Sequence, residues 1–406
     1  MFAIFFIVVL LASGSEPDCL GSLCDHKAKR KTAKRQANLP FKQIMSSSDA
    51  MGTKQPKLVL VTGANGYIGS SLIKTLLERG YKVRGTVRDP TDKKLTSAVQ
   101  AFPNASTHLE LVPLELTGET EMFREALKGG VEWIMHVASP CDQTETNDEV
   151  MIRPAVEGTL SILRAAKVTP SVTKVVLTSS MSAVSSGHDK KTTFSEKDWS
   201  NLDGPNLNPY SKSKTLAERA AWEFMASHET TFTLSAINPS FVLGPVPSKD
   251  VSTSTEIISQ IMTAGVPAFH MLCPIVDIRD VVEAHIQAAL IPEAAGKRFL
   301  LTNTDDGEML YMSDISTILA KEFNPRGYNI KTNIVPRWIL WFMSFFDKTL
   351  AFFYRMIDAT AHFDNSQSKD ILKLKYDIPA RQTILDGAHS MIEQGVIPKQ
   401  PGYKKI

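Results

Sequence analysis

A tyrosine and a lysine one helical turn apart form a pair that can do acid–base chemistry. Tyr210 and Lys214 lie in residues 208–224, which begin with Asn208 and Pro209 and continue with residues that favour helix. Side chains four positions apart share one face of a helix. A phenol has a pKa near ~10, and a neighbouring ammonium favours the phenolate and lowers that pKa. The pair therefore predicts a site at which Tyr210 exchanges a proton with a substrate.

Hydroxyl groups mark the end of a predicted strand upstream of this helix. Residues 174–182 begin as an apolar run and end in serines, including Ser180 and Ser182. Ligands of open α/β sheets bind beyond the carboxyl ends of the strands, so these serines are candidates for catalysis. His136 lies inside another apolar run, residues 131–140. A histidine in such a place is usually buried and satisfied, so it is not assigned as a base.

Three glycines follow the first apolar run of the chain and precede a helical pattern. Residues 58–69 contain Gly63, Gly66 and Gly69 in the spacing G-x-x-G-x-x-G, and apolar residues then recur at helical spacing. A strand, a tight glycine turn and a helix N-terminus together place backbone N–H groups where a phosphate can bind. The segment predicts a dinucleotide site in which Gly69 allows close packing of the helix.

The residue after the second predicted strand bears on the choice of cofactor. Residues 81–87 form that strand and Arg88 follows it, with Lys93 and Lys94 close behind. An acid at this place accepts the ribose 2′-hydroxyl of NAD, whereas an arginine accommodates the 2′-phosphate of NADP. NADP (NADPH) is therefore expected, and NAD is the alternative.

Strands and helices alternate over most of the chain, and the expected fold is α/β. Further strands are predicted at residues 109–114 and 231–238, and helices at 150–167 and 281–290. The pattern indicates a doubly wound parallel sheet (Rossmann) with a smaller C-terminal substrate lobe. The expected NADP-binding domain covers residues 56–245, with 275–295 returning to it. Residues 246–274 and 296–406 are assigned to the substrate-binding lobe.

Residues 1–55 are expected to be a leader and basic linker outside the fold. Residues 1–12 are apolar and small polar residues follow, which is the form of a signal-peptide core, although no basic residue precedes the run. Residues 27–35 carry a basic run that a nuclear address, a processing site, a membrane tether or a solvated linker would each explain. Cofactor use favours the cytoplasm and the apolar segment the secretory pathway, so the compartment stays open.

The charge and cysteine content exclude several classes of partner. The chain of 406 residues has a net charge of +2, of which residues 1–50 supply +3. The body is thus nearly neutral, and no nucleic-acid surface is expected. Four cysteines form neither a disulfide framework nor a metal spacing, so no metal site is predicted.

An aromatic stretch at residues 338–354 has three interpretations. Asp347 and Lys348 near its middle argue against a membrane span. A buried amphipathic helix pair is the favoured interpretation, and contact with a membrane surface or a lining of the substrate cleft are the others. The oligomeric state is not indicated by the sequence.

The motifs together resemble those of the extended short-chain dehydrogenase/reductase family. The glycine turn, the serine-ended strand and Tyr210-x-x-x-Lys214 occur in the family's order, and residues 87–90, 136–140, 177–180 and 213–218 are similar to its dihydroflavonol reductase and cinnamoyl-CoA reductase branch. The resemblance runs from about residue 57 to residue 397. It departs at Ser185 and at residues 206–209, where the plant enzymes carry substrate-binding features, so neither plant substrate is expected.

The resemblance implies a role for each matching residue. Tyr210 would give a proton to a substrate carbonyl, Lys214 would lower its pKa and hold the nicotinamide ribose, and Ser180 would hydrogen-bond the carbonyl oxygen, with Ser182 as the alternative. Gly63, Gly66, Tyr67 and Ile68 would hold the pyrophosphate. The remaining cofactor contacts implied are Arg88 and Lys94 at the 2′-phosphate, Glu115 and Leu116 at the adenine, Val137, Ala138 and Ser139 at the nicotinamide side, and Pro239, Val242 and Ser254 around that cradle.

The leading hypothesis is an NADPH-dependent carbonyl reductase that converts an aldehyde or ketone reversibly to an alcohol. An NAD-dependent 3β-hydroxysteroid dehydrogenase or sugar-nucleotide epimerase is the alternative among enzymes. A non-catalytic nucleotide-sensing protein is the alternative of another class. The substrate itself is not indicated by the sequence.

Overall fold

The computed structural model describes residues 58–141, 145–189, 191–205, 207–249, 253–265, 268–303, 310–346, 354, 357 and 360–404, without the side chains of 253 and 254. The predictions for residues 1–55, including the signal peptide and the basic run, lie outside these residues. All described residues belong to one unit, Lys54–Ile406.

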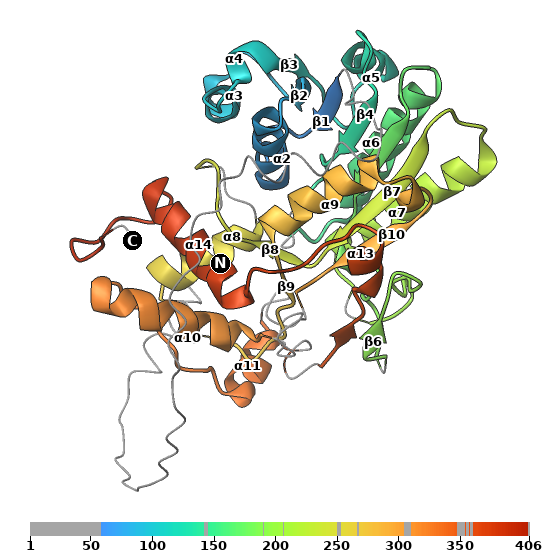
Figure 1. Cartoon of the computed structure of the whole chain (residues 1–406). Helices are drawn as coiled ribbons and strands as arrows, with labels where there is room; N and C mark the ends of the chain where they lie inside the picture. Colours follow the sequence, from blue (N-terminus) through green and yellow to red (C-terminus); the bar gives the residue numbers. More distant parts are fainter. Residues whose placement is uncertain are drawn as a thin grey trace, which may run out of the picture. The chain divides into compact units, whose positions relative to one another are not determined.

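Seven strands form one sheet in which all neighbouring strands run parallel (Figure 1). In chain order they are β1 (Val59–Thr62), β2 (Val83–Val87), β3 (Leu109–Pro113), β4 (Trp133–His136), β5 (Lys174–Thr178), β7 (Thr233–Pro239) and β10 (Arg298–Leu301). Their order across the sheet is β10-β7-β5-β4-β1-β2-β3. The order reverses beside β1, and this is the point at which doubly wound folds bind a dinucleotide.

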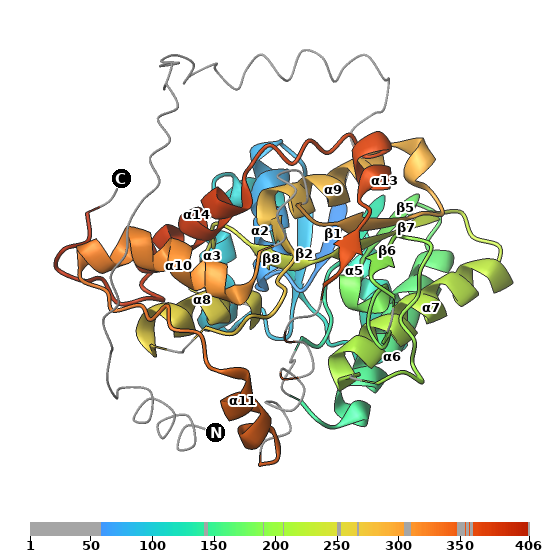
Figure 2. The ribbon, with the colours of Figure 1, turned by 90° about the horizontal axis from the view of Figure 1, so that it is seen from below.

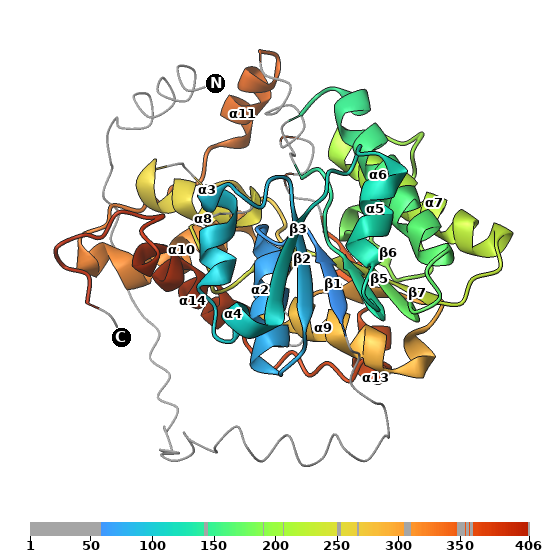
Figure 3. The same cartoon turned by 90° about the horizontal axis from the view of Figure 1, so that it is seen from above.

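Helices cover both faces of the sheet, because alternate strand residues point to opposite sides (Figure 3). Val59 and Val61 of β1 pack in the core on the side of α2 (Tyr67–Glu78) and α9 (Ile278–Leu290). Leu60 packs in a second core, on the side of α5 (Thr120–Leu127), α6 (Asp148–Lys167) and α7 (Pro209–Ser227). The predicted doubly wound α/β fold is confirmed by this arrangement.

Shorter elements extend from the sheet. After β2 come α3 (Lys93–Gln100) and α4 (Ala105–His108), and single 3-10 turns occur at η3 (Met181–Ala183), η4 (Pro292–Ala294) and η5 (Asn324–Arg326). Two small parallel pairs join β6 (Thr193–Phe194) to β11 (His362–Phe363) and β8 (Phe241–Leu243) to β9 (Ile275–Asp277).

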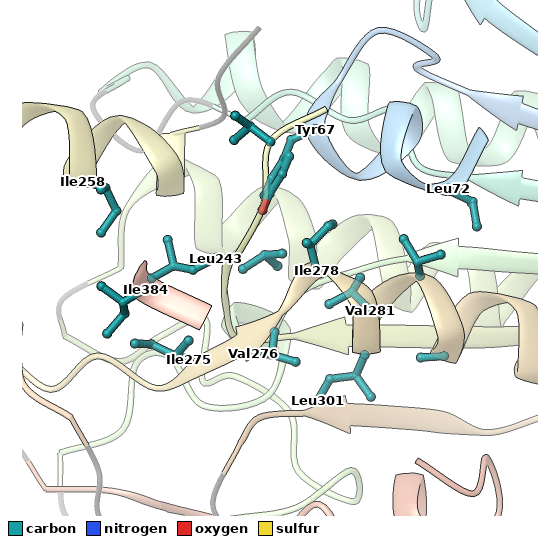
Figure 4. Close-up of a cluster of buried hydrophobic side chains, with 14 of the residues drawn as sticks. Tyr67, Leu72, Leu243, Ile258, Ile275, Val276, Ile278, Val281, Leu301 and Ile384 are labelled. Carbon is teal, nitrogen blue, oxygen red and sulfur yellow. The ribbon is translucent and has the colours of Figure 1, made fainter. Parts of the chain in front are cut away.

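The C-terminal region is mostly helical and lies beyond β8 and β9. It contains α8 (Thr253–Thr263), α10 (Met312–Phe323), α11 (Arg337–Ser344), α13 (Ser366–Asp370) and α14 (Ala380–Glu393), and Figure 2 shows α8, α10 and α14 gathered at one side of the sheet. Its core is continuous with that of the sheet, as Leu243, Ile258 and Ile384 pack with Ile278 and Val281 in one cluster (Figure 4). The two regions are therefore fastened together by a shared apolar core.

Two predictions about the C-terminal half need correction. Residues 296–406 were assigned to the lobe, whereas Arg298–Leu301 forms β10 and completes the sheet against β7. The favoured interpretation of the aromatic stretch was a buried helix pair, whereas Trp338, Trp341 and Phe345 on and after α11 are half or more exposed. Residues 347–353 of that stretch lie outside the described residues. Within the described part of the chain, no helix combines the length and apolar character needed to cross a bilayer.

Candidate active site

The turn between β1 and α2 is built so closely that only glycine fits. Gly63 has a positive φ of 71°, and a Cβ on Gly69 would lie 2.1 Å from the carbonyl oxygen of Gly63. The same oxygen accepts a hydrogen bond from the N–H of Gly66 at 3.1 Å. A Cβ on Gly63 would lie 3.2 Å from the backbone of Ala138, so the turn also approaches the end of β4. Gly69 is thus required by the turn itself rather than by strand packing.

The N-terminus of α2 presents backbone donors to the space beyond the strands. Gly66 is the N-cap residue and no side chain caps the helix. The N–H groups of the first turn, which include those of Tyr67 and Ile68, have no intrahelical acceptor in any α-helix and suit an anion. The Tyr67 side chain points away into the core, where its hydroxyl donates to the carbonyl of Gly244 at 2.9 Å (Figure 4). Only the backbone of Tyr67 is therefore available to a pyrophosphate.

Thr62 holds the ends of β1 and β4 together. Its hydroxyl accepts the backbone N–H groups of Val137 and Ala138, both at 3.0 Å, and lies 3.0 Å from Nδ1 of His136. Because it accepts twice, this hydroxyl donates to His136, which fixes the histidine proton on Nε2. Burial lowers the pKa of His136 to about 3, aided by the charge of Lys214. His136 is consequently neutral and buried, as expected from its place in an apolar strand, whereas its Nε2 has no hydrogen-bond partner among the described residues.

The residues predicted for the ribose 2′-phosphate lie together on the surface. Arg88 directly follows β2 and Lys94 lies in the first turn of α3, and both side chains are exposed. Two acids lie between them. Asp89 accepts hydrogen bonds from the N–H and the hydroxyl of Thr91, which lower its pKa, and Asp92 accepts the backbone N–H of Lys94 at 2.8 Å. Among the residues that the structure describes, no carboxylate forms an ion pair with Arg88. The guanidinium is thus available to an anion from solution.

The other predicted cofactor contacts follow strands of the sheet or lie in elements beyond it. Glu115 is exposed after β3, while Leu116 is half-buried and packs where Gly158 leaves room on α6. Residues 137–139 follow β4 and are half-buried. Pro239 ends β7, Val242 is buried in β8, and Ser254 belongs to α8, although its side chain is outside the described residues.

Ser180, Tyr210 and Lys214 meet beyond the end of β5. Ser180 is buried as the N-cap of η3, where its Oγ accepts the N–H of Ser182 at 3.1 Å. Its hydroxyl lies close enough to the phenol of Tyr210 to act on the pKa of that group. Lys214 lies one turn after Tyr210 on α7, with Nζ 5.9 Å from the centre of the tyrosine ring. The carbonyl of Ser182 accepts the hydroxyl of Ser200 at 2.7 Å.

Burial dominates the protonation of this group. It raises the pKa of Tyr210 well above its usual value, with the neighbouring Cys141 adding to the rise and the Ser180 hydroxyl opposing it. Burial also lowers the pKa of Lys214, while the neighbouring Cys141 and Glu218 oppose that shift. The lowering of the tyrosine pKa expected from the lysine is not found, because burial raises that pKa instead. The phenol is protonated at neutral pH and is equipped to donate a proton.

A histidine from the far face of the sheet supports Lys214. The lysine Nζ donates to the carbonyl of Thr178 at 3.3 Å, and the Thr178 hydroxyl lies 2.7 Å from Nε2 of His285 on α9. Nδ1 of His285 donates to the carbonyl of Val281 at 2.7 Å, so Nε2 accepts from the threonine. Burial lowers the pKa of His285 to about 4, which keeps it neutral.

A buried ion pair lies beneath the serine and the lysine. Glu218, one turn after Lys214, is fully buried and pairs with Arg298 of β10 at 2.6 Å. The Glu218 carboxylate also accepts Ser179 Oγ at 2.6 Å and Asn238 Nδ2 at 2.7 Å. Asn238 Nδ2 lies 3.2 Å from the carbonyl of Ser180 as well. The network therefore joins α7, β5, β7 and β10 at the residues that carry the chemistry.

Sequence reasoning missed these supporting residues and also Cys141. Glu218 could have been found from the sequence, because a carboxylate four residues after Lys214 lies on the same helix face, and alanines are close to it in the sequence. Thr178, Asn238 and Arg298 had none, since only the sheet order brings their strands together. Cys141 follows the end of β4 and was dismissed as isolated, although the fold brings it to Tyr210 and Lys214.

Known reductases resemble this chain in sequence. The chain is 37% identical over 273 residues to cinnamoyl-CoA reductase 1 of Petunia hybrida, an alignment that covers 66% of this chain and 78% of that protein. It is 34% identical over 263 residues to dihydroflavonol 4-reductase of Gerbera hybrida, covering 63% and 70%. These proteins belong to the branch that the sequence motifs resemble.

Solved structures show the same architecture. The yeast methylglyoxal/isovaleraldehyde reductase Gre2, in complex with NADPH, superposes with a TM-score of 0.67 at 29% identity and covers 84% of this chain and 100% of its own. Vestitone reductase from alfalfa (Medicago sativa L.) superposes with a TM-score of 0.66 at 25% identity, covering 84% and 99%. The model of the NAD dependent epimerase/dehydratase family matches residues 59–300. The match contains β1 to β9, the glycine turn and the Ser180, Tyr210 and Lys214 group, and it ends within β10. The chain thus belongs to the NAD dependent epimerase/dehydratase family and is an NAD(P)-dependent reductase of the kind that acts on carbonyl groups.

Proposed function

We propose that this protein reduces a small aldehyde or ketone to the alcohol with NADPH, using Ser180, Tyr210 and Lys214. The observation that carries the proposal is the convergence of these three side chains beyond β5, with Ser180 and Lys214 buried. The glycine turn supports a dinucleotide at the same edge of the sheet. A Cβ on Gly69 would lie 2.1 Å from the carbonyl oxygen of Gly63, so glycine is needed to keep the turn that presents the N-terminus of α2 to a pyrophosphate. Arg88 and Lys94 support the choice of a cofactor with a 2′-phosphate.

Each residue has one task in the proposed reaction. Bound NADPH would supply a hydride to the carbonyl carbon. The Ser180 hydroxyl orients the carbonyl oxygen, and Tyr210 gives its phenolic proton to that oxygen as the carbon–oxygen double bond becomes single. The phenolate that remains is stabilised by the ammonium of Lys214, whose own position is fixed by the carbonyl of Thr178. The raised pKa of Tyr210 keeps the proton in place until it is needed.

The raised pKa of Tyr210 should affect the pH dependence of the rate differently in reduction and in oxidation. Reduction requires the phenol, so its rate should change little across neutral pH. Oxidation of an alcohol requires the phenolate, so its rate should continue to rise with pH into the alkaline range. A pH profile measured in both directions tests this assignment.

The test is a panel of aldehydes and ketones monitored by NADPH absorbance, with Tyr210→Phe as the first variant. The variant should lose turnover and retain NADPH affinity, because its hydroxyl acts in the transition state. Ser180→Ala should lower kcat strongly, whereas the matched control Ser182→Ala should not. Retention of more than about a tenth of the wild-type rate by Tyr210→Phe would contradict the mechanism. Preference for NADH with a steroid or a nucleotide sugar would support the alternative hypotheses, and NADPH binding without turnover on any carbonyl would support a sensor.

A further inference from the structure

We infer that the aromatic surface of α11 docks the protein onto an anionic lipid bilayer. Eight large apolar side chains of the described residues are strongly exposed, and six of them lie between residues 334 and 346. These six form what is called here the aromatic patch: Ile334, Trp338, Trp341, Phe342, Phe345 and Phe346. Their exposed fractions run from 50% to 70%. Scattered exposed apolar residues are ordinary, but a contiguous cluster of this kind marks an interaction surface.

The spacing of the aromatic residues places them on one face of the helix. Trp338, Trp341, Phe342 and Phe345 follow the pattern i, i+3, i+4, i+7, which is the apolar stripe of an amphipathic helix. Such a stripe normally faces the core, yet here the core contact is made by Leu340, which is 5% exposed and packs with residues 335 and 357. The helix is consequently apolar on both sides, and its aromatic side faces away from the protein.

The rings of the patch pack on one another rather than under another element. Trp341 and Phe345 contact edge to face with centroids 4.9 Å apart, and the rings of Phe342 and Phe346 lie 5.4 Å apart. This self-stacking keeps a broad apolar surface together at the outside of the molecule. Figure 2 shows α11 projecting from the group of C-terminal helices.

The chemistry around the patch favours a lipid surface over a second copy of the chain. Tryptophan is enriched at membrane interfaces because its ring is apolar and its N–H is polar. The exposed Lys331 comes shortly before the patch. Two copies meeting through this face would bring two such lysines together, whereas anionic headgroups would complement their charge. A helix of eight residues is too short to span, so it would lie in the plane of the interface.

Tryptophan fluorescence separates the patch from the leader. Residues 1–57 contain no Trp, and the other tryptophans of the chain are Trp133, Trp199 and Trp222, which are buried or half-buried in the described structure. Full-length protein would be mixed with vesicles of phosphatidylcholine alone or with added phosphatidylserine, carrying bromine on the acyl chains. Bromine quenches only those tryptophans that enter the bilayer, so Trp338 and Trp341 report on the patch alone.

We expect wild-type protein to float with the phosphatidylserine vesicles and its fluorescence to be quenched, with weaker binding at high salt. The double variant Trp338→Ser/Phe345→Ser should bind at least about tenfold more weakly, since two exposed rings are removed. Val150→Ser/Val168→Ser is the matched control, because it removes exposed apolar surface elsewhere and should bind as wild type. Equal thermal melting of the variants would show that all are folded.

Three outcomes would overturn the inference. Wild-type protein that stays with the buffer would exclude a lipid partner. Flotation without quenching, unchanged in Trp338→Ser/Phe345→Ser, would assign membrane contact to the leader alone. A patch-dependent dimer in the absence of vesicles, converted to a monomer by the same variant, would assign the patch to a second copy.

Discussion

Two buried histidines should make the protein lose stability in acid. Burial lowers the pKa of His136 to about 3 and that of His285 to about 4, from an unfolded value near 6.5. A histidine with a lowered folded pKa contributes stability that is fully present above its unfolded pKa and lost as the pH falls through that value. At ~1.36 kcal/mol for each unit between 6.5 and 5, each histidine removes about 2 kcal/mol from the free energy of unfolding at pH 5. The pair together removes about 4 kcal/mol.

Asp280 opposes this loss. Burial and the charge of Asp277 raise its pKa to about 7, so the folded state takes up a proton before the unfolded state does. Over the two units from 7 to 5 this adds at most about 2.7 kcal/mol, an upper limit because the side chain is partly exposed. Wild-type protein should thus lose at least about 1 kcal/mol between pH 8 and pH 5. The histidine effect is partly concealed unless the groups are separated by substitution.

Substitutions that keep the hydrogen bonds can separate the contribution of the two histidines from that of Asp280. His136→Asn retains an acceptor for Thr62, and His285→Gln retains one for Thr178. We expect the double histidine variant to become more stable on going from pH 8 to pH 5, by up to about 2.7 kcal/mol. Asp280→Asn should instead lose the full ~4 kcal/mol over the same range. Urea unfolding at the two pH values measures both. The reasoning is refuted if the double histidine variant loses stability in acid as wild type does.

Three further predictions concern the cofactor site and the buried ion pair. Arg88→Ala should lower kcat/KM with NADPH by about ten- to several-hundred-fold and change that with NADH far less, since charged hydrogen bonds contribute ~1.5–3 kcal/mol each; an equal loss for both cofactors would show that Arg88 does not contact the phosphate. Gly69→Ala should weaken NADPH binding more than about tenfold in a fluorescence titration, because the added Cβ would collide with the backbone of the turn. The control is Gly80→Ala, whose Cβ would meet no atom within 4 Å and which should only reduce stability through its positive φ. Arg298→Met should reduce the free energy of unfolding by about 3–5 kcal/mol by leaving Glu218 unpaired, and adding Glu218→Leu should recover most of this in urea unfolding.

The sheet and the main motifs could be predicted because their signals are local in sequence. The glycine turn, each strand end and the Tyr210/Lys214 pair can each be recognised from a dozen residues or fewer, and the structure places them as expected from parallel topology. Boundaries were less predictable: residues 131–140 were expected to be one strand, but β4 ends at His136 because Thr62 takes up the next two backbone donors. A hydrogen bond across 75 residues leaves no trace in local periodicity.

The remaining errors arise from tertiary context. Arg298 follows an irregular stretch and resembles any surface arginine until β10 is known to lie beside β7. The aromatic residues of α11 fit a buried helix by period alone, because periodicity identifies an apolar face without telling what covers it. The direction of the tyrosine pKa shift likewise depends on burial, which spacing does not report.

The pairing of Glu218 with Arg298 also sets an order of events during synthesis of the chain. The two residues are 80 positions apart, so the arginine emerges about 4–16 s after the glutamate at ~5–20 residues per second. Until then the outer edge of β7 has no neighbouring strand. The Glu218 carboxylate can accept hydrogen bonds from Ser179 and Asn238, but it lacks the guanidinium of Arg298. An unpaired strand edge is a template for aggregation. We therefore expect the nascent chain to expose the edge of β7 during this interval, and a premature stop before residue 298 would leave the sheet without β10.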